Sequence, residues 1–195
     1  KKYIFIIDEI NRGEISKIFG ELFFAIDPGY RGKAGEISTQ YATLHSDPDE
    51  KFYIPENVYI IGTMNDIDRS VDSFDFAMRR RFRFVELKAD ERLEMLASLE
   101  NEELEAEAIK RMSALNKEIA NVEDLNENYQ IGAAYFLKLK TLDFDQLWTD
   151  YLQPLLQEYI HGMYDEEGLM NRFAKAYGYQ KPVEGDVNET TQDQG

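Results

Sequence analysis

The sequence has 195 residues with 22 basic and 38 acidic side chains, which gives a formal net charge of −16. A hydrophobic fraction of 43% is enough for a packed core, and the lack of cysteine excludes disulfides, thiolate metal sites and cysteine nucleophiles. No apolar run approaches the roughly 20 residues that a membrane-spanning helix needs, and no signal peptide is visible, so we expect a cytoplasmic protein without membrane contact. The negative net charge argues against a domain that binds nucleic acid over its whole surface.

The negative charge is concentrated in the second half of the chain. Residues 1–88 hold 13 basic and 15 acidic side chains, whereas residues 89–127 hold 4 and 12. This change predicts a boundary between subdomains near Lys88. We expect a second subdomain over 89–178 and a disordered tail over 179–195, which is polar and almost free of large apolar side chains.

The first 88 residues alternate between strand and helix patterns. Continuous apolar runs over 3–7 and 58–63 predict strands that are buried on both faces, as in a parallel sheet. Apolar residues at spacings of three and four predict an amphipathic helix over 15–26. Other patterns predict a β-hairpin over about 37–54, a short helix around 72–80 and a strand over 82–87. This alternation is typical of an α/β layered domain.

The pattern becomes helical after Ala89. One apolar stripe runs from Leu104 to Ile119, with acidic side chains on the opposite face. A second stripe begins at Phe144 and continues beyond Pro154, which should kink the helix or start a new one. A last helix is predicted over 165–177.

Two adjacent carboxylates, Asp8 and Glu9, directly follow the first predicted strand. Ligands of open α/β sheets bind at the carboxyl ends of the strands. Because neighbouring side chains of a strand face differently, one carboxylate can organise a metal-bound water shell while the other polarises an attacking water. That is the arrangement of a Walker B motif in a nucleoside triphosphatase. The alternative is a strand end with a solvated acidic turn.

Asn65 follows the second predicted strand in the same way. Its carboxamide can hold a water or a γ-phosphate by hydrogen bonds, although an ordinary turn asparagine has the same appearance. Four arginines lie within five residues, at positions 79, 80, 81 and 83. They are compatible with an arginine finger that reaches a neighbouring subunit's nucleotide, with cations at a helix C-terminus, or with a DNA-backbone patch.

No segment supplies a phosphate-binding loop. The run Gly29-Tyr30-Arg31-Gly32-Lys33-Ala34 has too short a spacing, has alanine in place of the metal-binding hydroxyl, and follows a helix rather than a strand. We interpret it as a turn that leads into the hairpin.

Three motifs together resemble one family. They are Asp8-Glu9-Ile10-Asn11-Arg12, Met64-Asn65-Asp66-Ile67-Asp68-Arg69-Ser70 and Arg79-Arg80-Arg81-Phe82. In order and spacing they resemble the AAA+ GTPases of the McrB type, the motor subunits of modification-dependent McrBC restriction systems. The resemblance covers residues 1–88 and weakens from 89 to about 161.

This resemblance implies the roles of the site residues. Asp8 would hold the water shell of Mg²⁺, Glu9 would activate water and Asn65 would be the first sensor. Asp68 and Arg69 would lie near the bound nucleotide, at the hydrolysis site or its subunit interface. Arg80 and Arg81 would be the candidates for the trans-acting finger, and the nucleotide would be GTP or ATP.

The resemblance also implies the architecture and the partners. The fold would be a partial AAA+ three-layer αβα core, from the Walker B strand onward and with the hairpin as an insert, followed by an α-helical lid. Such motors form hexameric rings and act with an McrC-like nuclease subunit on DNA, which other domains or the ring pore would contact.

Two departures from the family pattern limit these expectations. Gln130 stands where similar proteins have a basic second sensor. The first core strands and the phosphate loop are absent, so we expect the isolated chain to be inactive and the strand over 82–87 to lack its usual neighbour. The alternative functions are a MoxR-like chaperone ATPase and a non-catalytic acidic interaction module.

Overall fold

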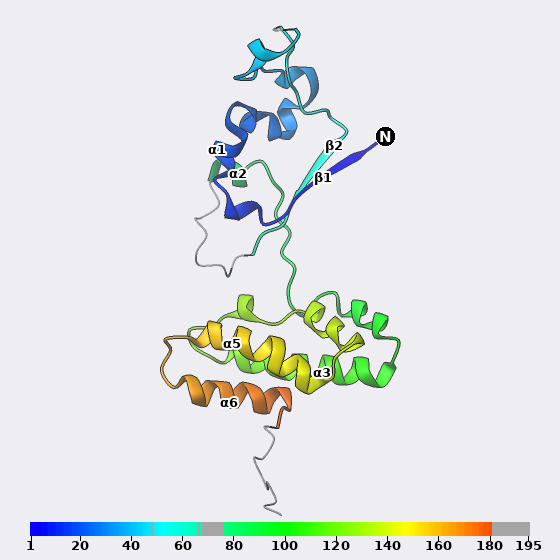
Figure 1. Ribbon diagram of the computed structural model, residues 1–195, viewed down its shortest axis with the longest axis vertical. Coiled ribbons are helices and arrows are strands. Elements are labelled where there is room, and N and C mark those ends of the chain that lie inside the picture. The colour runs from blue at the N-terminus through cyan, green and yellow to red at the C-terminus, as the bar shows by residue number, and fades with distance from the viewer. Residues whose placement is uncertain (48, 66, 68–75, 181–195) are drawn as a thin grey trace, which may run out of the picture. The chain divides into compact units, whose positions relative to one another are not determined.

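The computed structural model describes residues 1–47, 49–65, 67 and 76–180 (Figure 1). The chain divides into two compact units, Lys1–Glu86 and Leu87–Gly195. We call the first the core unit and the second the lid unit.

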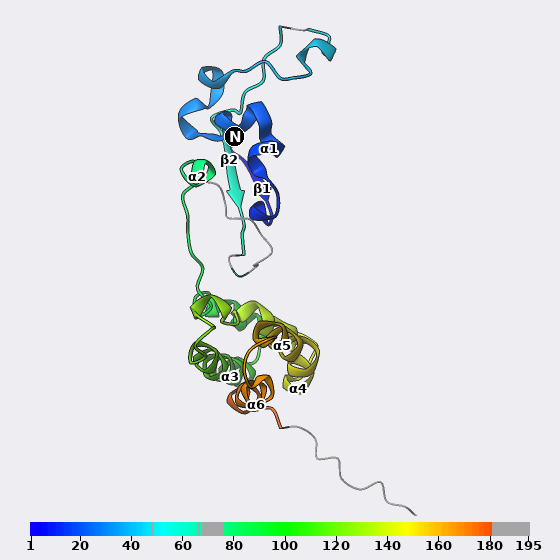
Figure 2. The same cartoon turned by 90° about the vertical axis from the view of Figure 1, so that its left-hand side faces the viewer.

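The core unit is built on a two-stranded parallel sheet. Strand β1 (Tyr3–Ile7) pairs with β2 (Val58–Gly62), with Tyr3 opposite Val58 and Ile7 opposite Gly62, and Figure 2 shows the two strands side by side. Both predicted strands and their parallel pairing are therefore confirmed. Their order in the chain, with helices between them, is that of a crossover connection.

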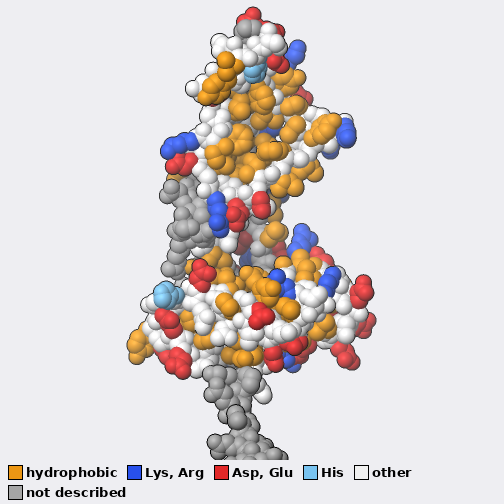
Figure 3. Space-filling view, in the orientation of Figure 1, with side chains coloured by type: hydrophobic (Ala, Val, Ile, Leu, Met, Phe, Trp, Pro, Cys, Tyr) orange, Lys and Arg blue, Asp and Glu red, His pale blue; other side chains and the backbone are white. Residues whose placement is uncertain are grey.

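The prediction that these strands are buried on both faces is wrong. Ile4 and Ile6 are each 65% exposed, and Tyr3 and Phe5 are more than half exposed. Figure 3 shows hydrophobic side chains over much of the visible face of the core unit. The physical reason is that two paired strands, without further strands beside them among the described residues, cannot bury both faces of a sheet.

The helix predicted over 15–26 forms in two pieces. An α-helix, α1 (Ile15–Phe19), is followed by a 3-10 helix, η2 (Gly20–Ile26), and Gly20 adopts a φ of +48° at the junction. This backbone conformation is accessible to glycine at little cost, which explains the break. The pieces nevertheless supply half of the small core of the unit, which consists of Ile10, Ile15, Ala25, Ile26, Ile54 and Met78.

The segment after this helix contains short 3-10 turns instead of a regular hairpin. These are η3 (Pro28–Tyr30), η4 (Gly32–Gly35) and η5 (Ala42–Leu44). The predicted hairpin over 37–54 is reduced to a single antiparallel bridge, in which Ile37 and Phe52 exchange two backbone hydrogen bonds of 2.9 Å. The two ends of the predicted hairpin therefore meet, but its strands do not extend.

The last part of the core unit contains one short helix, α2 (Phe76–Arg79). The rest of the helix predicted around 72–80 lies partly outside the described residues. The strand predicted over 82–87 is wrong, because this segment has no regular secondary structure. Its apolar side chains suit a strand, but a ladder also needs a neighbouring backbone, and β1 and β2 pair with each other.

The lid unit is helical, as predicted. Its longest helix, α3 (Glu102–Ala120), packs against α6 (Glu166–Tyr177), which also contacts α5 (Gln153–Ile160) (Figure 1). The other elements are η6 (Leu93–Leu99), η7 (Glu127–Tyr129), η8 (Ala133–Lys140), α4 (Phe144–Leu147) and η9 (Trp148–Leu152). The predicted stripe along α3 is buried at Ala108, Met112, Leu115 and Ile119.

Helix ends in the lid unit are capped by side chains that the sequence supplies. Asn101 accepts a hydrogen bond of 3.0 Å from the backbone of Leu104 at the start of α3. Asp143 and Gln146 form a reciprocal capping box at α4. Pro154 lies in the first turn of α5, directly after the π-helical turn η9, so the predicted perturbation at this proline is a widened turn.

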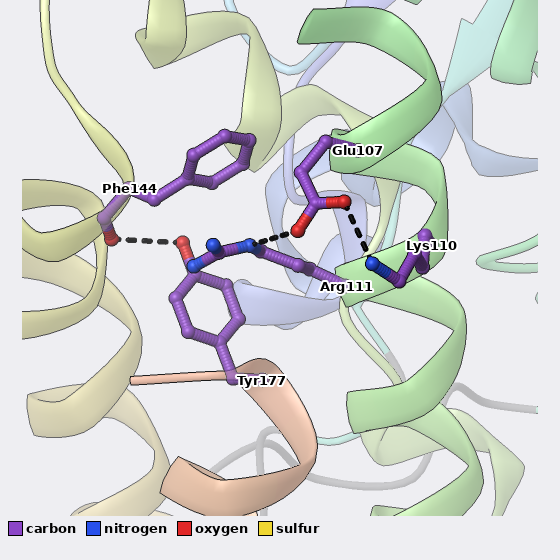
Figure 4. A network of polar contacts seen from close by, with 5 residues as sticks. All are labelled: Glu107, Lys110, Arg111, Phe144 and Tyr177. Carbon is purple, nitrogen blue, oxygen red and sulfur yellow. Dashed lines mark hydrogen bonds and ion pairs between the residues drawn. The ribbon is translucent and has the colours of Figure 1, made fainter. Parts of the chain in front are cut away.

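A cation and two aromatic rings pack together in the lid unit (Figure 4). The guanidinium of Arg111 lies 4.2 Å from the ring centre of Phe144 and 5.5 Å from that of Tyr177, and its Nε donates to Glu107 at 2.8 Å. The hydroxyl of Tyr177 donates to the backbone oxygen of Phe144 at 2.9 Å. Trp148 stacks on Tyr177, so these contacts join α3, α4, η9 and α6 into one core.

Within the described ranges, no helix is long and apolar enough to cross a membrane.

Candidate functional site

The carboxyl ends of β1 and β2 meet at the candidate site. Thr63, the first residue after β2, donates its backbone N–H to Ile7 at 3.0 Å and accepts at its backbone oxygen from Ile10 at 2.8 Å. Its hydroxyl accepts from the backbone N–H of Glu9 at 3.0 Å and donates to the carboxylate of Asp8. The predicted acidic pair and the end of the predicted sensor strand are thus directly bonded.

Glu9 has an unusual backbone. Its φ and ψ are 50° and 49°, a left-handed conformation that is uncommon for residues other than glycine, and the 3-10 helix η1 (Ile10–Arg12) starts directly after it. The Glu9 carboxylate is exposed and accepts from the Nε of Arg12 at 2.7 Å. The two adjacent carboxylates therefore have different partners, because Asp8 accepts from Thr63 and Glu9 accepts from Arg12.

Close packing beneath this turn explains a glycine at the end of β2. A Cβ atom added to Gly62 would lie 2.8 Å from the Cδ1 atom of Ile10, which is almost fully buried. The turn can therefore approach β2 closely only because position 62 has no side chain.

The sensor candidate Asn65 belongs to the same corner of the fold. Its backbone oxygen accepts from the side-chain amide of Asn11 at 3.1 Å. Its own side-chain oxygen accepts from the backbone N–H of Ile67 at 3.2 Å, and the residue is exposed. The structure therefore brings Asp8, Glu9 and Asn65 to one edge of the sheet, joined through Thr63 and Asn11.

The arginine cluster is not uniform. Arg81 is partly buried: its guanidinium lies 4.2 Å from the ring centre of Phe23, its Nη1 donates to the backbone oxygen of Ala77, and its buried Nε has no hydrogen-bond partner among the described residues. The guanidinium of Arg79 lies 5.2 Å from the ring centre of Phe84. Arg80 is exposed and, in the part of the chain that the structure describes, its side chain has no ion pair or hydrogen bond. Of the two finger candidates, Arg80 is the one available to another molecule.

Three further predicted positions have different outcomes. Asp68 and Arg69 lie outside the described residues. Gln130, at the expected second-sensor position, is partly buried. Its side-chain amide donates a hydrogen bond of 3.4 Å to the backbone oxygen of Asn116. The adjacent Ile131 exchanges two hydrogen bonds with the Asn116 side chain, of 2.7 and 2.8 Å. Gln130 is therefore attached to α3 within the lid unit.

The acidic pair fits a magnesium ion better than a metal held by protein alone. Within residues 1–47, 49–65, 67 and 76–180, no group of three or more His, Cys, Asp or Glu side chains could hold a metal. Mg²⁺ keeps several waters and takes one or two carboxylates together with substrate phosphates. Asp8 is exposed and binds Thr63 through one carboxylate oxygen, Oδ1, so that Oδ2 can accept a hydrogen bond from a metal-bound water.

Sequence reasoning did not identify three side chains of this site: Thr63, Asn11 and Arg12. Asn11 and Arg12 lie inside the first motif, and their proximity to the acidic pair was the available signal. Thr63 lies two residues before Asn65, and its hydroxyl could have been recognised as the polar group at the tip of a strand.

Comparison with known proteins assigns a domain family to each of the two units. Residues 1–82 match the family model of the AAA domain of the dynein-related subfamily, and residues 107–167 match that of the McrB alpha-helical lid domain.

Two curated relatives are similar over part of their length. The chain is 36% identical over 173 residues to the type IV methyl-directed restriction enzyme EcoKMcrB subunit of Escherichia coli, a match that covers 82% of this chain and 37% of that protein. It is 32% identical over 94 residues to the type II restriction enzyme BsuMI component YdiS of Bacillus subtilis, covering 45% of this chain and 27% of that protein. The chain thus spans about a third of the length of the curated relatives.

The match to the AAA domain lies in the α/β unit, and the match to the lid domain lies in the helical unit that follows it. The restriction subunit of Escherichia coli is similar across most of the chain. On these findings, the chain belongs to the AAA+ family and carries an AAA domain followed by a lid of the McrB type.

Proposed function

We propose that this chain is part of a motor subunit of a restriction system, in which a nucleoside triphosphatase site is built on the carboxyl ends of β1 and β2. The observation that carries the proposal is the direct bonding of the Asp8-Glu9 turn to the end of the strand that leads to Asn65. Both relatives named above are restriction-enzyme components, which supports the same process.

The residues of the site divide the work of hydrolysis. Glu9, exposed at the turn, would take a proton from the attacking water, and Asn65 would orient that water or the γ-phosphate. Asp8 would hold the water shell of Mg²⁺, which, when bound, neutralises charge on the phosphates. Asp68 and Arg69, which belong to the second motif of the resemblance, would complete the nucleotide side of the site.

The proposed assembly is a hexameric ring that hydrolyses GTP, or ATP, and acts with an McrC-like nuclease subunit on DNA. Arg80 would reach the nucleotide of the neighbouring subunit, because its side chain is exposed and unpaired among the described residues. Arg81 would instead support the core unit through Phe23 and Ala77. The isolated chain supplies no phosphate loop, so by itself it would not hydrolyse nucleotide.

The test is hydrolysis of GTP and ATP by the full-length subunit and by the isolated chain. We expect Glu9→Gln to lower the turnover number of the full-length subunit about 100-fold or more, because the general base is lost. The matched control is Glu14→Gln, which removes an exposed carboxylate that pairs with Lys17, and it should leave turnover unchanged. Full activity of the Glu9→Gln variant, or hydrolysis by the isolated chain, would contradict the proposal.

The same assay separates the two arginines. Subunits carrying Arg80→Ala and subunits carrying Glu9→Gln should each be inactive, but their mixture should recover part of the activity, because some interfaces then combine an intact Glu9 with an intact Arg80. Arg81→Ala should instead lower the melting temperature, since a partly buried packing contact is lost. A mixture without recovered activity would exclude Arg80 as a trans-acting finger.

A further inference from the structure

One residue bonds to the whole turn that carries the acidic pair. Thr63 contacts four successive residues: its backbone joins Ile7 and Ile10, and its hydroxyl joins Asp8 and Glu9. The backbone bonds, of 3.0 and 2.8 Å, would form with any residue at this position. The two hydroxyl bonds are specific to a side chain that can donate and accept at the same time.

The hydroxyl acts on two groups with different proposed roles. By accepting from the Glu9 N–H at 3.0 Å, it holds the left-handed turn that redirects the Glu9 side chain, and by donating to Oδ1 it fixes the carboxylate of Asp8. A carboxylate held at one oxygen presents the other in a defined direction. Outer contacts of this kind orient metal-associated carboxylates and tune their chemistry.

We propose that Thr63 is a positioning residue for nucleotide hydrolysis, whose hydroxyl couples the orientation of Asp8 to that of Glu9. The inference rests on the proposed function and adds a residue to it. Thr63 touches neither the nucleotide nor water in this role, and it acts only through the two carboxylate residues. Because Thr63 is next to the segment that ends in Asn65, a shift of this segment on nucleotide binding would reach both carboxylates through one side chain.

The test compares Thr63→Val with Thr63→Ser in the full-length subunit, by steady-state GTP and ATP hydrolysis over a range of Mg²⁺ concentrations. Valine keeps the shape, the β-branching and the backbone bonds but removes the hydroxyl, whereas serine keeps the hydroxyl. We expect Thr63→Val to lower kcat about 10- to 100-fold and to raise the Mg²⁺ concentration needed for half-maximal activity. The KM for nucleotide should change much less than kcat, and Thr63→Ser should restore both parameters to near the wild-type values.

The controls separate positioning from folding. Thr141→Val removes a threonine hydroxyl in the lid unit that donates a hydrogen bond of 3.3 Å to the backbone oxygen of Lys138. This variant should leave kcat and the Mg²⁺ dependence unchanged. Circular dichroism and melting temperature report whether each variant folds, and Thr63→Ala repeats the measurement with a smaller side chain.

The outcomes distinguish the inference from the proposed function. A wild-type full-length subunit without hydrolysis would overturn the proposed function and the inference with it. An active wild type with an equally active Thr63→Val, or a Thr63→Ser as impaired as valine, would overturn the inference alone. Unfolding of both Thr63→Val and Thr63→Ala would also overturn it, because the hydroxyl would then be required for folding rather than for orientation.

Discussion

The core unit and the lid unit differ in how completely they bury their apolar side chains. Among the described residues, 19 buried hydrophobic side chains lie in the lid unit and 7 in the core unit. Large exposed hydrophobic side chains show the reverse distribution, with 15 in the core unit and 3 in the lid unit. The surface of the core unit is therefore more hydrophobic than that of the lid unit, although the two units are similar in length (Figure 3).

The difference follows from the elements that each unit contains. Five helical elements of the lid unit share one core around Trp148 and Tyr177, and α3, α4 and α6 each begin with a side-chain cap. The core unit has a sheet of two strands, which leaves apolar faces and backbone edges without cover among the described residues. We therefore expect the lid unit to fold alone, and we expect the strands that carry Asp8, Glu9 and Asn65 to need support from other protein surface.

The largest expected effect is seen when the units are separated. A protein of residues 87–180 should unfold cooperatively, because it contains a closed core, whereas residues 1–86 alone should show no cooperative transition. Thermal unfolding followed by circular dichroism tests both proteins. Binding of a hydrophobic dye by residues 1–86, and not by residues 87–180, should accompany the difference. A cooperative transition of residues 1–86 would break the comparison.

A smaller effect is expected from a single substitution that creates a cavity in the lid core. Phe173 is fully buried on α6, and Phe173→Ala should lower the free energy of unfolding of the lid by about 3–5 kcal/mol. Trp148 is the only tryptophan of the sequence, so its fluorescence during urea unfolding reports the lid transition. The control is Tyr164→Ala, whose side chain is 98% exposed and whose removal should change stability by less than about 0.5 kcal/mol. Equal effects of the two variants would contradict a closed lid core.

The sequence predicted the helical unit more completely than the sheet. The stripe along α3 and the final helix, α6, could be read from local periodicity, because each helix satisfies its own backbone hydrogen bonds. The strand predicted over 82–87 and the hairpin over 37–54 had suitable residues, but a strand exists only where a second backbone is available. That information is not local, and the structure gives these segments one bridge and no ladder.

The site shows the same limit at the level of single residues. Asp8, Glu9 and Asn65 were recognisable because each follows an apolar strand pattern and belongs to a motif. Thr63 was not, since its importance depends on the register in which Ile7 lies opposite Gly62, which brings position 63 beside the acidic pair. The different environments of Arg80 and Arg81 likewise depend on the position of Phe23, far away in the sequence.

The smallest expected effect is the response of the lid to alkaline pH. Burial raises the pKa of Tyr159 to about 12, with smaller contributions from Tyr135, Glu158 and Tyr129. Burial likewise raises the pKa of Tyr177. A raised pKa in the folded state means that folding favours the neutral phenol, so this contribution to stability is complete below the unfolded pKa of about 10 and is lost as the pH rises toward 12.

Phenylalanine variants isolate this contribution, because they have no phenol to ionise. Tyr177→Phe should be less stable than wild type at pH 8 by about 1 kcal/mol, since the hydrogen bond from its hydroxyl to Phe144 is lost. That deficit should shrink between pH 10 and pH 12, as wild type loses stability that the variant does not depend on. Tyr159→Phe should likewise flatten the loss of stability over this interval. Urea unfolding monitored by circular dichroism at steps between pH 8 and pH 12 measures both differences, and parallel pH profiles for wild type and both variants would show that the two phenols lie in a more hydrated core than the structure describes.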